Sequence, residues 1–337
     1  MASPEEPAAA LSRLLQGYRV TQAIHVAATL GIADLLADGP RTADELAAET
    51  GTHAPTLARL LRALASLGVL AEGDNGRFAT TPVGDCLRSG EPGSLADFAA
   101  FVGRPYHWEA WSALVQSVRT GENAFRLVHG RDVWSYRAER PEEAALFDRV
   151  MATLSAAATE AVLAAYDFGR FGRLVDVGGG TGTLLAGVLA AHPALEGVLF
   201  DQPHVVARAP AVLAEAGVAD RCRIEPGSFF DGVPAGADAY VLRSIVHDWG
   251  DAEAVAILRA CRAAMADEGV VLVIERELGG PNEKPDAKLS DLNMLVGPGG
   301  RERSRDEYAA LFGAAGLRLA RVVPTVAGAD VLEASPA

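Results

Sequence analysis

The sequence contains almost no lysine. Of its 30 basic residues only Lys284 and Lys288 are lysines, and 44 acidic residues bring the net charge to −14. The pI is about 5.0, and a chain this acidic repels phosphate backbones. Nucleic acid is therefore not expected as a partner unless one face is locally basic.

Cysteine is also scarce. Cys86, Cys222 and Cys261 lie far apart in the sequence, and no pair of them has the spacing of metal ligands. This spacing argues against a metal site built on cysteines. We interpret each cysteine as a small buried hydrophobe in a reducing compartment.

Apolar runs of membrane-spanning length are missing as well. The best candidate, residues 20–37, is interrupted by Gln22, His25 and Asp34, whereas a spanning helix needs about 20 mostly apolar residues. The first residues, Met-Ala-Ser-Pro-Glu-Glu, are acidic and have no positive region before an apolar core, so we expect no signal peptide. We expect a cytoplasmic protein with no membrane partner.

What the sequence does have is length and apolar content. Its 337 residues, half of them hydrophobic, suit two domains, or one domain with an extension, around a large core. Two helices broken near Gly31 are expected between residues 8 and 38. A capping box at Thr42 to Glu45 then opens a short helix, and Pro55 starts another.

The hairpin signal Asp74-Asn75-Gly76 follows these helices and completes a winged-helix pattern. Such a module often binds DNA. The would-be recognition helix, however, offers only Arg59 and Arg62, and acidic residues lie close by. We therefore favour a scaffold or a dimer interface over a DNA reader.

Residues 93–166 are expected to be helical and rich in aromatic side chains, most of which are ordinary core. Phe147 and Met151 fall one helical turn apart and are candidates for the wall of a substrate pocket, together with Trp108.

The second half is organised around residues 173–183, in which a buried strand runs into a glycine loop and then into a helix. Gly178, Gly180 and Gly182 let the backbone turn and approach a ligand closely. A dinucleotide fingerprint would need glycine where Thr183 stands, and the Lys-Ser/Thr ending of a phosphate loop is missing. The loop therefore predicts a nucleotide-type crevice that matches neither of these two phosphate-binding motifs.

Strands and helices alternate after this loop, as they do in a doubly wound α/β sheet. The last two strands, residues 317–323 and 330–333, are separated only by a short turn around Gly328 and should pair as an antiparallel hairpin. The other expected elements are strands at residues 198–200, 222–225, 239–242 and 270–274, and helices at residues 205–216 and 252–265.

Polar residues follow the carboxyl ends of these strands. Asp201 ends the second strand about 20 residues after the glycines, where a carboxylate can accept ribose hydroxyls. After the third strand, Ser228 can bond an adenine edge and Phe229 can pack on its face. After the fourth strand, His247 can take a proton at neutral pH because an imidazole has a pKa of about 6.5.

Three motifs give these residues a family resemblance. The runs Asp176-Val-Gly-Gly-Gly-Thr-Gly182, His247-Asp-Trp249 and Gly299-Gly-Arg-Glu-Arg-Ser304 resemble, in order and spacing, those of plant caffeate-type and bacterial natural-product O-methyltransferases that use S-adenosylmethionine (SAM). The similarity covers nearly the whole chain. It implies a Rossmann-like SAM methyltransferase sheet after a mainly helical winged-helix dimerisation domain, and a homodimer formed through the N-terminal helices.

The resemblance also implies domain limits and roles. We expect a dimerisation domain at 1–92, a helical linker and substrate-pocket region at 93–166, and a SAM-binding catalytic domain at 167–337. His247 matches the general base, and Glu275 and Glu302 match two carboxylates that orient it. The expected cofactor-binding residues are Asp176, Gly178, Gly180, Gly182, Asp201, Gln202, Gly227, Ser228, Phe229, Arg243 and Ser244. The expected substrate-binding residues are Trp108, Phe147, Met151, Asp248, Asn293 and Met294.

The implied reaction is metal-independent methylation of a phenolic or enolic hydroxyl on a small aromatic natural product, as in antibiotic biosynthesis and other secondary metabolism, with S-adenosylhomocysteine (SAH) as the product. Arg243 stands where plant members have lysine, so its role is open. Some family members use the same fold for decarboxylation, hydroxylation or pericyclic chemistry. Retention of His247, Glu275 and Glu302 favours methyl transfer.

Two rival hypotheses place the protein in different functional classes. A SAM-responsive winged-helix regulator would need a basic DNA-binding face. A metal-dependent catechol methyltransferase resembles a bare SAM domain without a long N-terminal region, and the sequence has no tight Asp/Asn cluster for a hard cation.

Overall fold

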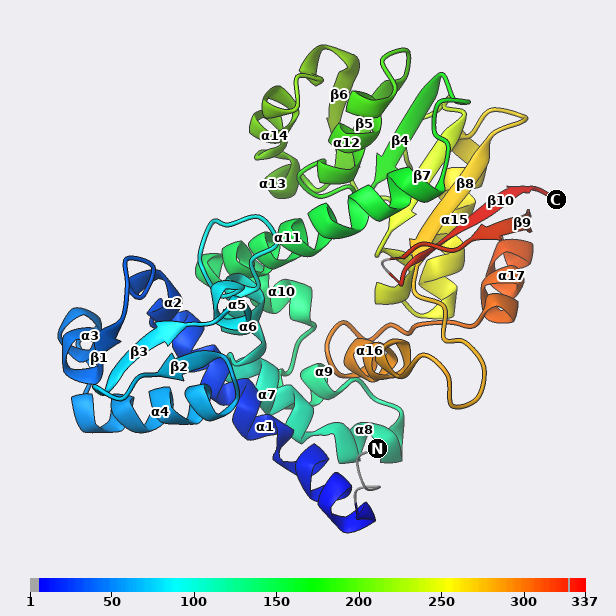
Figure 1. Ribbon diagram of the computed structural model, residues 1–337. Coiled ribbons are helices and arrows are strands. Elements are labelled where there is room, and N and C mark those ends of the chain that lie inside the picture. Colours follow the sequence, from blue (N-terminus) through cyan, green and yellow to red (C-terminus); the bar gives the residue numbers. More distant parts are fainter. Residues whose placement is uncertain (1–5, 327) are drawn as a thin grey trace. The chain divides into compact units, whose positions relative to one another are not determined.

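The computed structural model describes residues 6–326 and 328–337, and the side chains of residues 155–157 are not included. Most of the acidic N-terminal stretch therefore lies outside the described residues. The chain divides into two compact units, Met1–Glu109 with Pro141–Thr153 and Ala110–Arg140 with Leu154–Ala337. Figure 1 shows the helices and strands of both units.

Local sequence signals explain the helices of the first unit. Gly31 has a φ of +63° and separates the first two helices, as predicted. The side chains of Thr42 and Glu45 form the predicted capping box. The elements are α1 (Pro7–Thr29), α2 (Ile32–Leu35), β1 (Arg41–Thr42), α3 (Ala43–Thr50), α4 (Ala54–Ser66), β2 (Leu70–Glu72), β3 (Arg77–Thr80), α5 (Pro82–Asp85) and α6 (Ala96–Val102).

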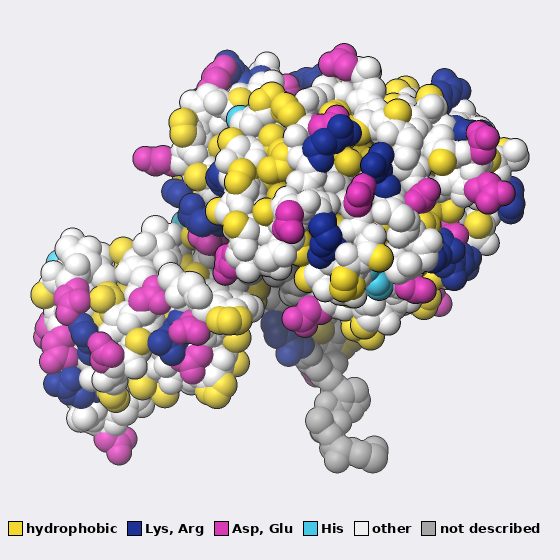
Figure 2. Space-filling model, turned by 90° about the horizontal axis from the view of Figure 1, so that it is seen from above, with side chains coloured by type: hydrophobic (Ala, Val, Ile, Leu, Met, Phe, Trp, Pro, Cys, Tyr) yellow, Lys and Arg dark blue, Asp and Glu magenta, His cyan; other side chains and the backbone are white. Residues whose placement is uncertain are grey.

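The three strands pair antiparallel in the order β1-β3-β2, so the predicted hairpin is present and β1 adds a strand that the sequence did not reveal. Arg62 of α4 forms an ion pair with Glu72 of β2 at 3.3 Å. On the face drawn in Figure 2, basic side chains are interspersed with acidic ones. Among the described side chains, no continuous basic stripe is visible on that face (Figure 2).

Five helices follow α6 in the chain, and two of them, α7 (Pro105–Ser112) and α11 (Pro141–Ala165), run from one unit into the other. The other three are α8 (Leu114–Thr120), α9 (Ala124–His129) and α10 (Val133–Ala138). Both α7 and α11 contain residues of each unit.

The second unit is a seven-stranded sheet in the order β6-β5-β4-β7-β8-β10-β9. The first five of these strands are parallel, and β10 pairs antiparallel with β8 and β9. This arrangement confirms the predicted Rossmann-like sheet with its antiparallel hairpin. The strands are β4 (Arg173–Val177), β5 (Glu196–Asp201), β6 (Cys222–Pro226), β7 (Ala239–Arg243), β8 (Val270–Glu275), β9 (Leu317–Val323) and β10 (Asp330–Pro336).

Alternating strand residues build a core on each face of this sheet. Tyr240 and Leu242 of β7 pack toward α15 (Asp251–Ala264) and α17 (Arg305–Ala314), whereas Ala239 and Val241 pack toward α11 and α12 (Thr183–Ala191). The remaining elements are α13 (Pro203–Val206), α14 (Ala209–Glu215), η1 (Ala219–Arg221), η2 (Val246–Asp248) and α16 (Pro285–Val296).

Two local predictions were wrong. The helix expected at residues 205–216 is split into α13 and α14, because Pro210 lies in the first turn of α14 and has no amide to continue an earlier helix. Cys86 is exposed and Cys222 is half-buried, whereas Cys261 is buried as expected. Among the described helices, none is long and apolar enough to span a membrane.

Candidate active site

The glycine loop follows β4 at the point where the sheet order reverses between β4 and β7. Gly178, Gly180 and Gly182 have φ values of +71°, +63° and +85°, which L side chains rarely adopt. A Cβ atom at Gly178 would lie 2.4 Å from Ile245 Cδ1, whereas one at Gly180 would meet nothing within 4 Å. The loop is therefore packed against the protein at its start and open at its centre.

Asp176 lies at the carboxyl end of β4 and is 1% exposed. Its Oδ2 atom has no hydrogen-bond partner among the described residues. Burial raises the pKa of this carboxyl to about 7, with Arg243 opposing the shift and Asp201 adding to it. Arg243, at the end of β7, donates a 3.0 Å hydrogen bond from Nη1 to Thr159 Oγ1 of α11.

Asp201 reaches the loop from the end of β5. Its Oδ2 atom accepts from the amide of Gly180 at 2.8 Å, and its Oδ1 atom accepts from the amide of Gln202 at 2.6 Å. Gly227, after β6, donates its amide to the Asp201 carbonyl at 2.9 Å. Three strand ends therefore bring their predicted cofactor residues to one edge of the sheet.

An aromatic cluster lies beside this edge. The ring centroids of Phe229 and Trp249 are 5.9 Å apart, and those of Phe230 and Trp249 are 4.8 Å apart, both nearly perpendicular. Phe229 Cε1 would lie 3.7 Å from a Cβ at Gly178. Ser228 Oγ accepts from the Phe230 amide at 3.3 Å. Phe229 is thus placed near the glycine loop, as the sequence predicted.

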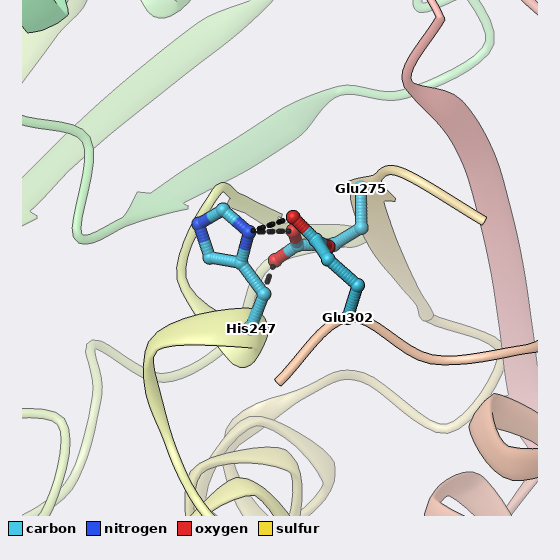
Figure 3. Close-up of side chains that lie close together, drawn as sticks. All are labelled: His247, Glu275 and Glu302. Carbon is cyan, nitrogen blue, oxygen red and sulfur yellow. Dashed lines mark hydrogen bonds and ion pairs between the residues drawn. The ribbon is translucent and has the colours of Figure 1, made fainter. Parts of the chain in front are cut away.

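His247 lies in the short 3-10 turn η2 that follows β7. Its Nδ1 atom is 3.1 Å from Glu302 Oε1 and 3.2 Å from Glu275 Oε2 (Figure 3). Its Nε2 atom is 3.7 Å from Asp248 Oδ1. The side chain is 15% exposed, whereas the two glutamates are nearly or fully buried. The ring is therefore held by one nitrogen, and the other is left for chemistry.

The two glutamates are fixed in different ways. Glu275, the last residue of β8, accepts with Oε1 from the backbone amides of Ile245, Val246 and His247 at 3.0, 2.9 and 3.4 Å. Glu302 accepts from Ser290 Oγ of α16 at 2.7 Å. Glu275 lies at the end of β8 and Glu302 in the segment before α17, yet both carboxylates contact the same ring nitrogen.

The neighbouring carboxylates make the imidazole of His247 more basic than a free one. Burial alone would lower the pKa of His247, but Glu275, Glu302 and Asp248 outweigh it and raise the pKa above its usual value. Burial raises the pKa of Glu275 to about 7 and that of Asp248 to about 6, although the histidine opposes both shifts. In its neutral form, His247 is therefore a stronger proton acceptor than a free imidazole.

The same three side chains could chelate a cation, because His247, Glu275 and Glu302 offer ligand atoms within 4.8 Å of one another. Nδ1 forms a hydrogen bond with Glu302 Oε1 at 3.1 Å, and its 3.2 Å contact with Glu275 Oε2 is an ion pair. This geometry is that of a histidine oriented by carboxylates.

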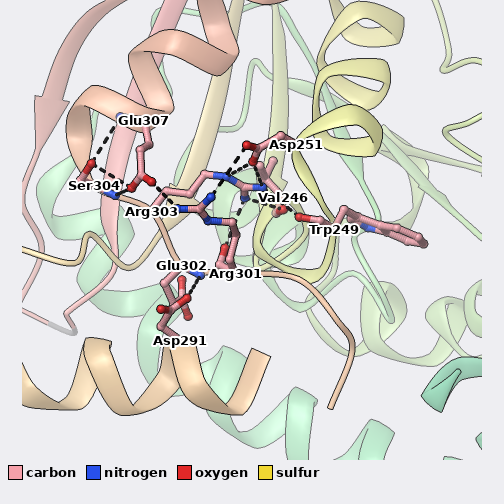
Figure 4. A network of polar contacts seen from close by, with 9 residues as sticks. All are labelled: Val246, Trp249, Asp251, Asp291, Arg301, Glu302, Arg303, Ser304 and Glu307. Atoms are coloured by element: carbon pink, nitrogen blue, oxygen red, sulfur yellow. Dashed lines mark hydrogen bonds and ion pairs between the residues drawn. The ribbon is translucent and has the colours of Figure 1, made fainter. Parts of the chain in front are cut away.

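Sequence reasoning missed the supporting residues Ser290 and Arg303. Ser290 bonds Glu302, and Asp291 Oδ1 accepts from the Glu302 amide at 2.9 Å. Arg303 is 1% exposed and contacts the turn that carries His247 (Figure 4). A local signal existed for one neighbour: Ser304 and Glu307 form a capping box that starts α17. The contacts of Ser290 and Arg303 had no local signal.

The predicted substrate residues fall in both units. Asp248 borders His247, and α16 of the same unit carries Asn293 and the buried Met294. Ser244, a predicted cofactor residue, follows β7 with a φ of +53°. Trp108, Phe147 and Met151 belong to the first unit, where Trp108 Nε1 donates to the Val102 carbonyl at 2.7 Å. Their contribution to a substrate pocket stays a prediction.

Fold and site together define the class of SAM-dependent methyltransferases, with a glycine loop and an acidic strand end beside a carboxylate-oriented histidine. Comparison with known proteins gives the family. The O-methyltransferase domain model matches residues 111–318, and the O-methyltransferase dimerisation domain model matches residues 12–90. The chain belongs to the O-methyltransferase family.

Individual relatives agree along nearly the whole chain. Phenazine O-methyltransferase PhzM of Lysobacter antibioticus is 44% identical over 326 residues, covering 97% of this chain and 95% of that protein. The crystal structure of LaPhzM has a TM-score of 0.95 at 43% identity and covers 99% of this chain and 100% of that one. NcsB1, an O-methyltransferase from neocarzinostatin biosynthesis solved with SAM and 2-hydroxy-5-methyl naphthoic acid, has a TM-score of 0.84 at 36% identity, covering 94% of this chain and 96% of that one. The protein is a SAM-dependent O-methyltransferase.

Proposed function

We propose that this enzyme methylates a phenolic or enolic hydroxyl of a small aromatic natural product, and that His247 is its general base. The observation that carries the proposal is the arrangement of the imidazole. Two buried carboxylates lie on Nδ1, so the proton on that atom is held and Nε2 is the atom that accepts a proton. Removal of the hydroxyl proton turns a weak nucleophile into a strong one.

The cofactor-binding residues are proposed from their place at the sheet edge. SAM supplies an electrophilic methyl group on a sulfonium centre. Asp176 offers a buried carboxylate oxygen without a hydrogen-bond partner, which suits an amino group. Asp201 presents a carboxylate beside the open centre of the loop at Gly180, where it can accept ribose hydroxyls. Gln202, Gly227, Ser228, Phe229, Arg243 and Ser244 complete the proposed set.

The acceptor class rests on the relatives. One similar protein is named a phenazine O-methyltransferase, and another, from neocarzinostatin biosynthesis, was solved with a naphthoic acid. Phenazines and naphthoic acids are both flat aromatic compounds. We assign the substrate contacts to Asp248, Asn293 and Met294, and to Trp108, Phe147 and Met151 of the first unit, and we place the enzyme in secondary metabolism such as antibiotic biosynthesis.

The base assignment is tested with His247→Ala and with His53→Ala, a surface histidine of the first unit, as the control. Wild-type enzyme is screened with hydroxyphenazines and hydroxynaphthoic acids, and SAH formation is measured at saturating SAM. We expect His247→Ala to lower kcat by about 10²- to 10⁴-fold and to keep its affinity for SAH. Full activity of this variant at neutral pH would refute the assignment.

Enzymes or regulators of another class would behave differently in the same assay. A decarboxylase, hydroxylase or pericyclase would consume the acceptor without forming SAH in equal amount. A metal-dependent enzyme would lose turnover in the presence of a chelator, whereas we expect no change. A winged-helix regulator would shift a DNA duplex in low salt, and we expect no shift.

We also propose the assembly and the division of labour in the chain. Residues 1–92 form the dimerisation domain of a homodimer, residues 93–166 form the linker and pocket wall, and residues 167–337 bind SAM. The match of residues 12–90 to a dimerisation domain supports the first part. Size-exclusion chromatography with light scattering tests the dimer. We propose a cytoplasmic location, with no nucleic-acid or membrane partner.

A further inference from the structure

The turn that carries His247 has its backbone groups satisfied from two opposite directions. On the amide side, Glu275 accepts from the N–H groups of residues 245–247. On the carbonyl side, Arg303 donates from Nη1 to the Val246 carbonyl at 3.1 Å and from Nη2 to the Trp249 carbonyl at 2.9 Å. The His247 carbonyl accepts from the Arg301 amide at 2.8 Å. A carboxylate and a guanidinium therefore clamp the turn between them.

Arg303 is itself held in place. Its Nε and Nη2 atoms both donate to Asp251 Oδ1, at 3.1 and 2.8 Å (Figure 4). Asp251 is the first residue of α15 and is 60% exposed, while the arginine side chain is 1% exposed. A buried arginine carries a large desolvation cost unless its donors are satisfied. The donors of Arg303 are used mainly on the histidine turn and on the helix that follows it.

The segment that carries Arg303 also lies directly on this turn. A Cβ atom at Gly300 would lie 2.0 Å from the His247 carbonyl oxygen and 2.3 Å from the Asp248 carbonyl carbon. Only glycine permits this approach. Glu302, in the same segment, reaches His247 Nδ1. One short segment thus provides a carboxylate for the imidazole and a guanidinium for the backbone beneath it.

We propose that Arg303 is a positioning residue for methyl transfer: it fixes the backbone of the His247 turn from the carbonyl side, as the counterpart of Glu275 on the amide side. The proposal rests on His247 being the base. Its physical reason is that a base works only within hydrogen-bond reach of the hydroxyl, and a displacement of about 1 Å can cost about 100-fold in rate. Arg303 touches neither substrate nor cofactor in this role.

The test compares Arg303→Met and Arg303→Lys with Arg305→Met. Arg305 is the control because its side chain is 57% exposed and pairs with Glu277 at 3.0 Å, away from the turn. Asp251→Asn is a milder variant that loosens Arg303 without removing it. For each we measure kcat and KM with a hydroxyphenazine or hydroxynaphthoic acid that the wild type methylates, SAH affinity by calorimetry, and hydrogen exchange of the amides of residues 245–249.

We expect Arg303→Met to lower kcat by about 100-fold with unchanged KM and SAH affinity, and Arg303→Lys and Asp251→Asn to give smaller losses in the same direction. Exchange should accelerate at residues 245–249 and stay unchanged in the glycine loop at residues 178–182. Wild-type kcat in Arg303→Met would overturn the proposal. If Arg303→Met does not fold, Asp251→Asn takes its place: a lowered kcat supports the proposal, and a wild-type kcat overturns it.

A double-mutant cycle separates this proposal from a general loss of structure. In a His247→Ala background, Arg303→Met should cause no further fall in kcat, because the residue acts through the histidine. A full additional fall would show that Arg303 acts elsewhere and would overturn the inference. If His247→Ala alone keeps its activity, the base assignment fails, and unchanged exchange at residues 245–249 would then refute the clamp as well.

Discussion

In the turn at His247, Nδ1 contacts Glu275 and Glu302, the amides of residues 245–247 donate to Glu275, and the Val246 and Trp249 carbonyls accept from Arg303. In the glycine loop one strand away, Gly180 faces open space and Asp176 has a buried oxygen without a partner. The protein's own groups hold the base, whereas the cofactor edge offers polar groups to a ligand. We therefore expect mutations in the turn to lower kcat, and mutations at the loop to weaken cofactor binding.

The largest effect is expected from Glu275→Gln. The substitution replaces a carboxylate that faces three backbone amides and the imidazole with an amide whose NH₂ group would oppose one of them. We expect kcat to fall on the order of 10³-fold, because the tautomer and the position of His247 are both lost. SAH affinity, measured by calorimetry, should stay near wild type.

Two controls sharpen this result. Glu277→Gln changes a glutamate two residues away that pairs with Arg305, and it should leave kcat unchanged. Glu302→Gln keeps an acceptor for Ser290 and removes only one carboxylate from Nδ1, so its loss should be smaller than that of Glu275→Gln. Equal losses of kcat in Glu275→Gln and Glu302→Gln would contradict the different roles that we give to the two carboxylates.

Asp201→Asn tests the cofactor side of the comparison. The carboxylate of Asp201 is the group beside Gly180 that can accept ribose hydroxyls. Loss of a charge-assisted hydrogen bond should weaken SAH binding roughly 10- to 100-fold, while kcat at saturating SAM should change little. Asp231→Asn, in the loop after β6, is the control. Tight SAH binding by Asp201→Asn together with a low kcat would show that the two regions are not separate in function.

The sequence revealed these two regions unequally for a physical reason. The glycine loop at residues 178–182 and the Thr42 capping box depend on residues close together in the chain, so both could be recognised in the sequence. His247 was singled out by its position after the fourth strand, whereas Glu275 and Glu302 were identified by resemblance to a family. The bond from Arg303 to Val246 joins residues 57 positions apart, and that from Ser290 to Glu302 joins residues on a helix and a loop. Such contacts exist only once the sheet has formed.

A third prediction concerns pH and the unpartnered Asp176. Burial raises the pKa of this carboxyl to about 7 in the folded protein, from 3.8 without burial. The folded state therefore holds a proton that the unfolded chain releases, and this contribution to stability is present below the unfolded pKa and is lost as pH rises from about 4 to about 7.

Asp176→Asn should remove this pH-dependent loss of stability, because asparagine does not titrate. Measured as Tm between pH 5 and pH 8 without cofactor, the wild type should lose stability relative to the variant as pH rises. The raised pKa values of Glu275 and Asp248 act in the same direction in both proteins and cancel in the difference. Asp267→Asn, at an exposed site, is the control. Parallel Tm curves for the wild type and Asp176→Asn would mean that Asp176 is already ionised in the folded protein.

The smallest effect is expected at the two lysines, which both lie beside the loop between β8 and α16. Lys288 Nζ donates to the carbonyls of Leu278 at 3.1 Å and Gly280 at 2.8 Å, and also to that of Glu283. Lys284 forms only a half-exposed 3.5 Å ion pair with Asp330. Lys288→Met should therefore lower the free energy of unfolding by about 1–3 kcal/mol, and Lys284→Met by about 0–1 kcal/mol, as measured in urea.

The lysine variants also test whether the loop between β8 and α16 helps to hold His247 in position. The loop that Lys288 fastens joins Glu275, at the end of β8, to the helix that presents Ser290 to Glu302. Loosening it should shift both carboxylates against His247, so Lys288→Met should also lower kcat, by less than Arg303→Met, and leave SAH affinity unchanged. A variant that lost SAH affinity first would show that this loop supports the cofactor edge instead of the base.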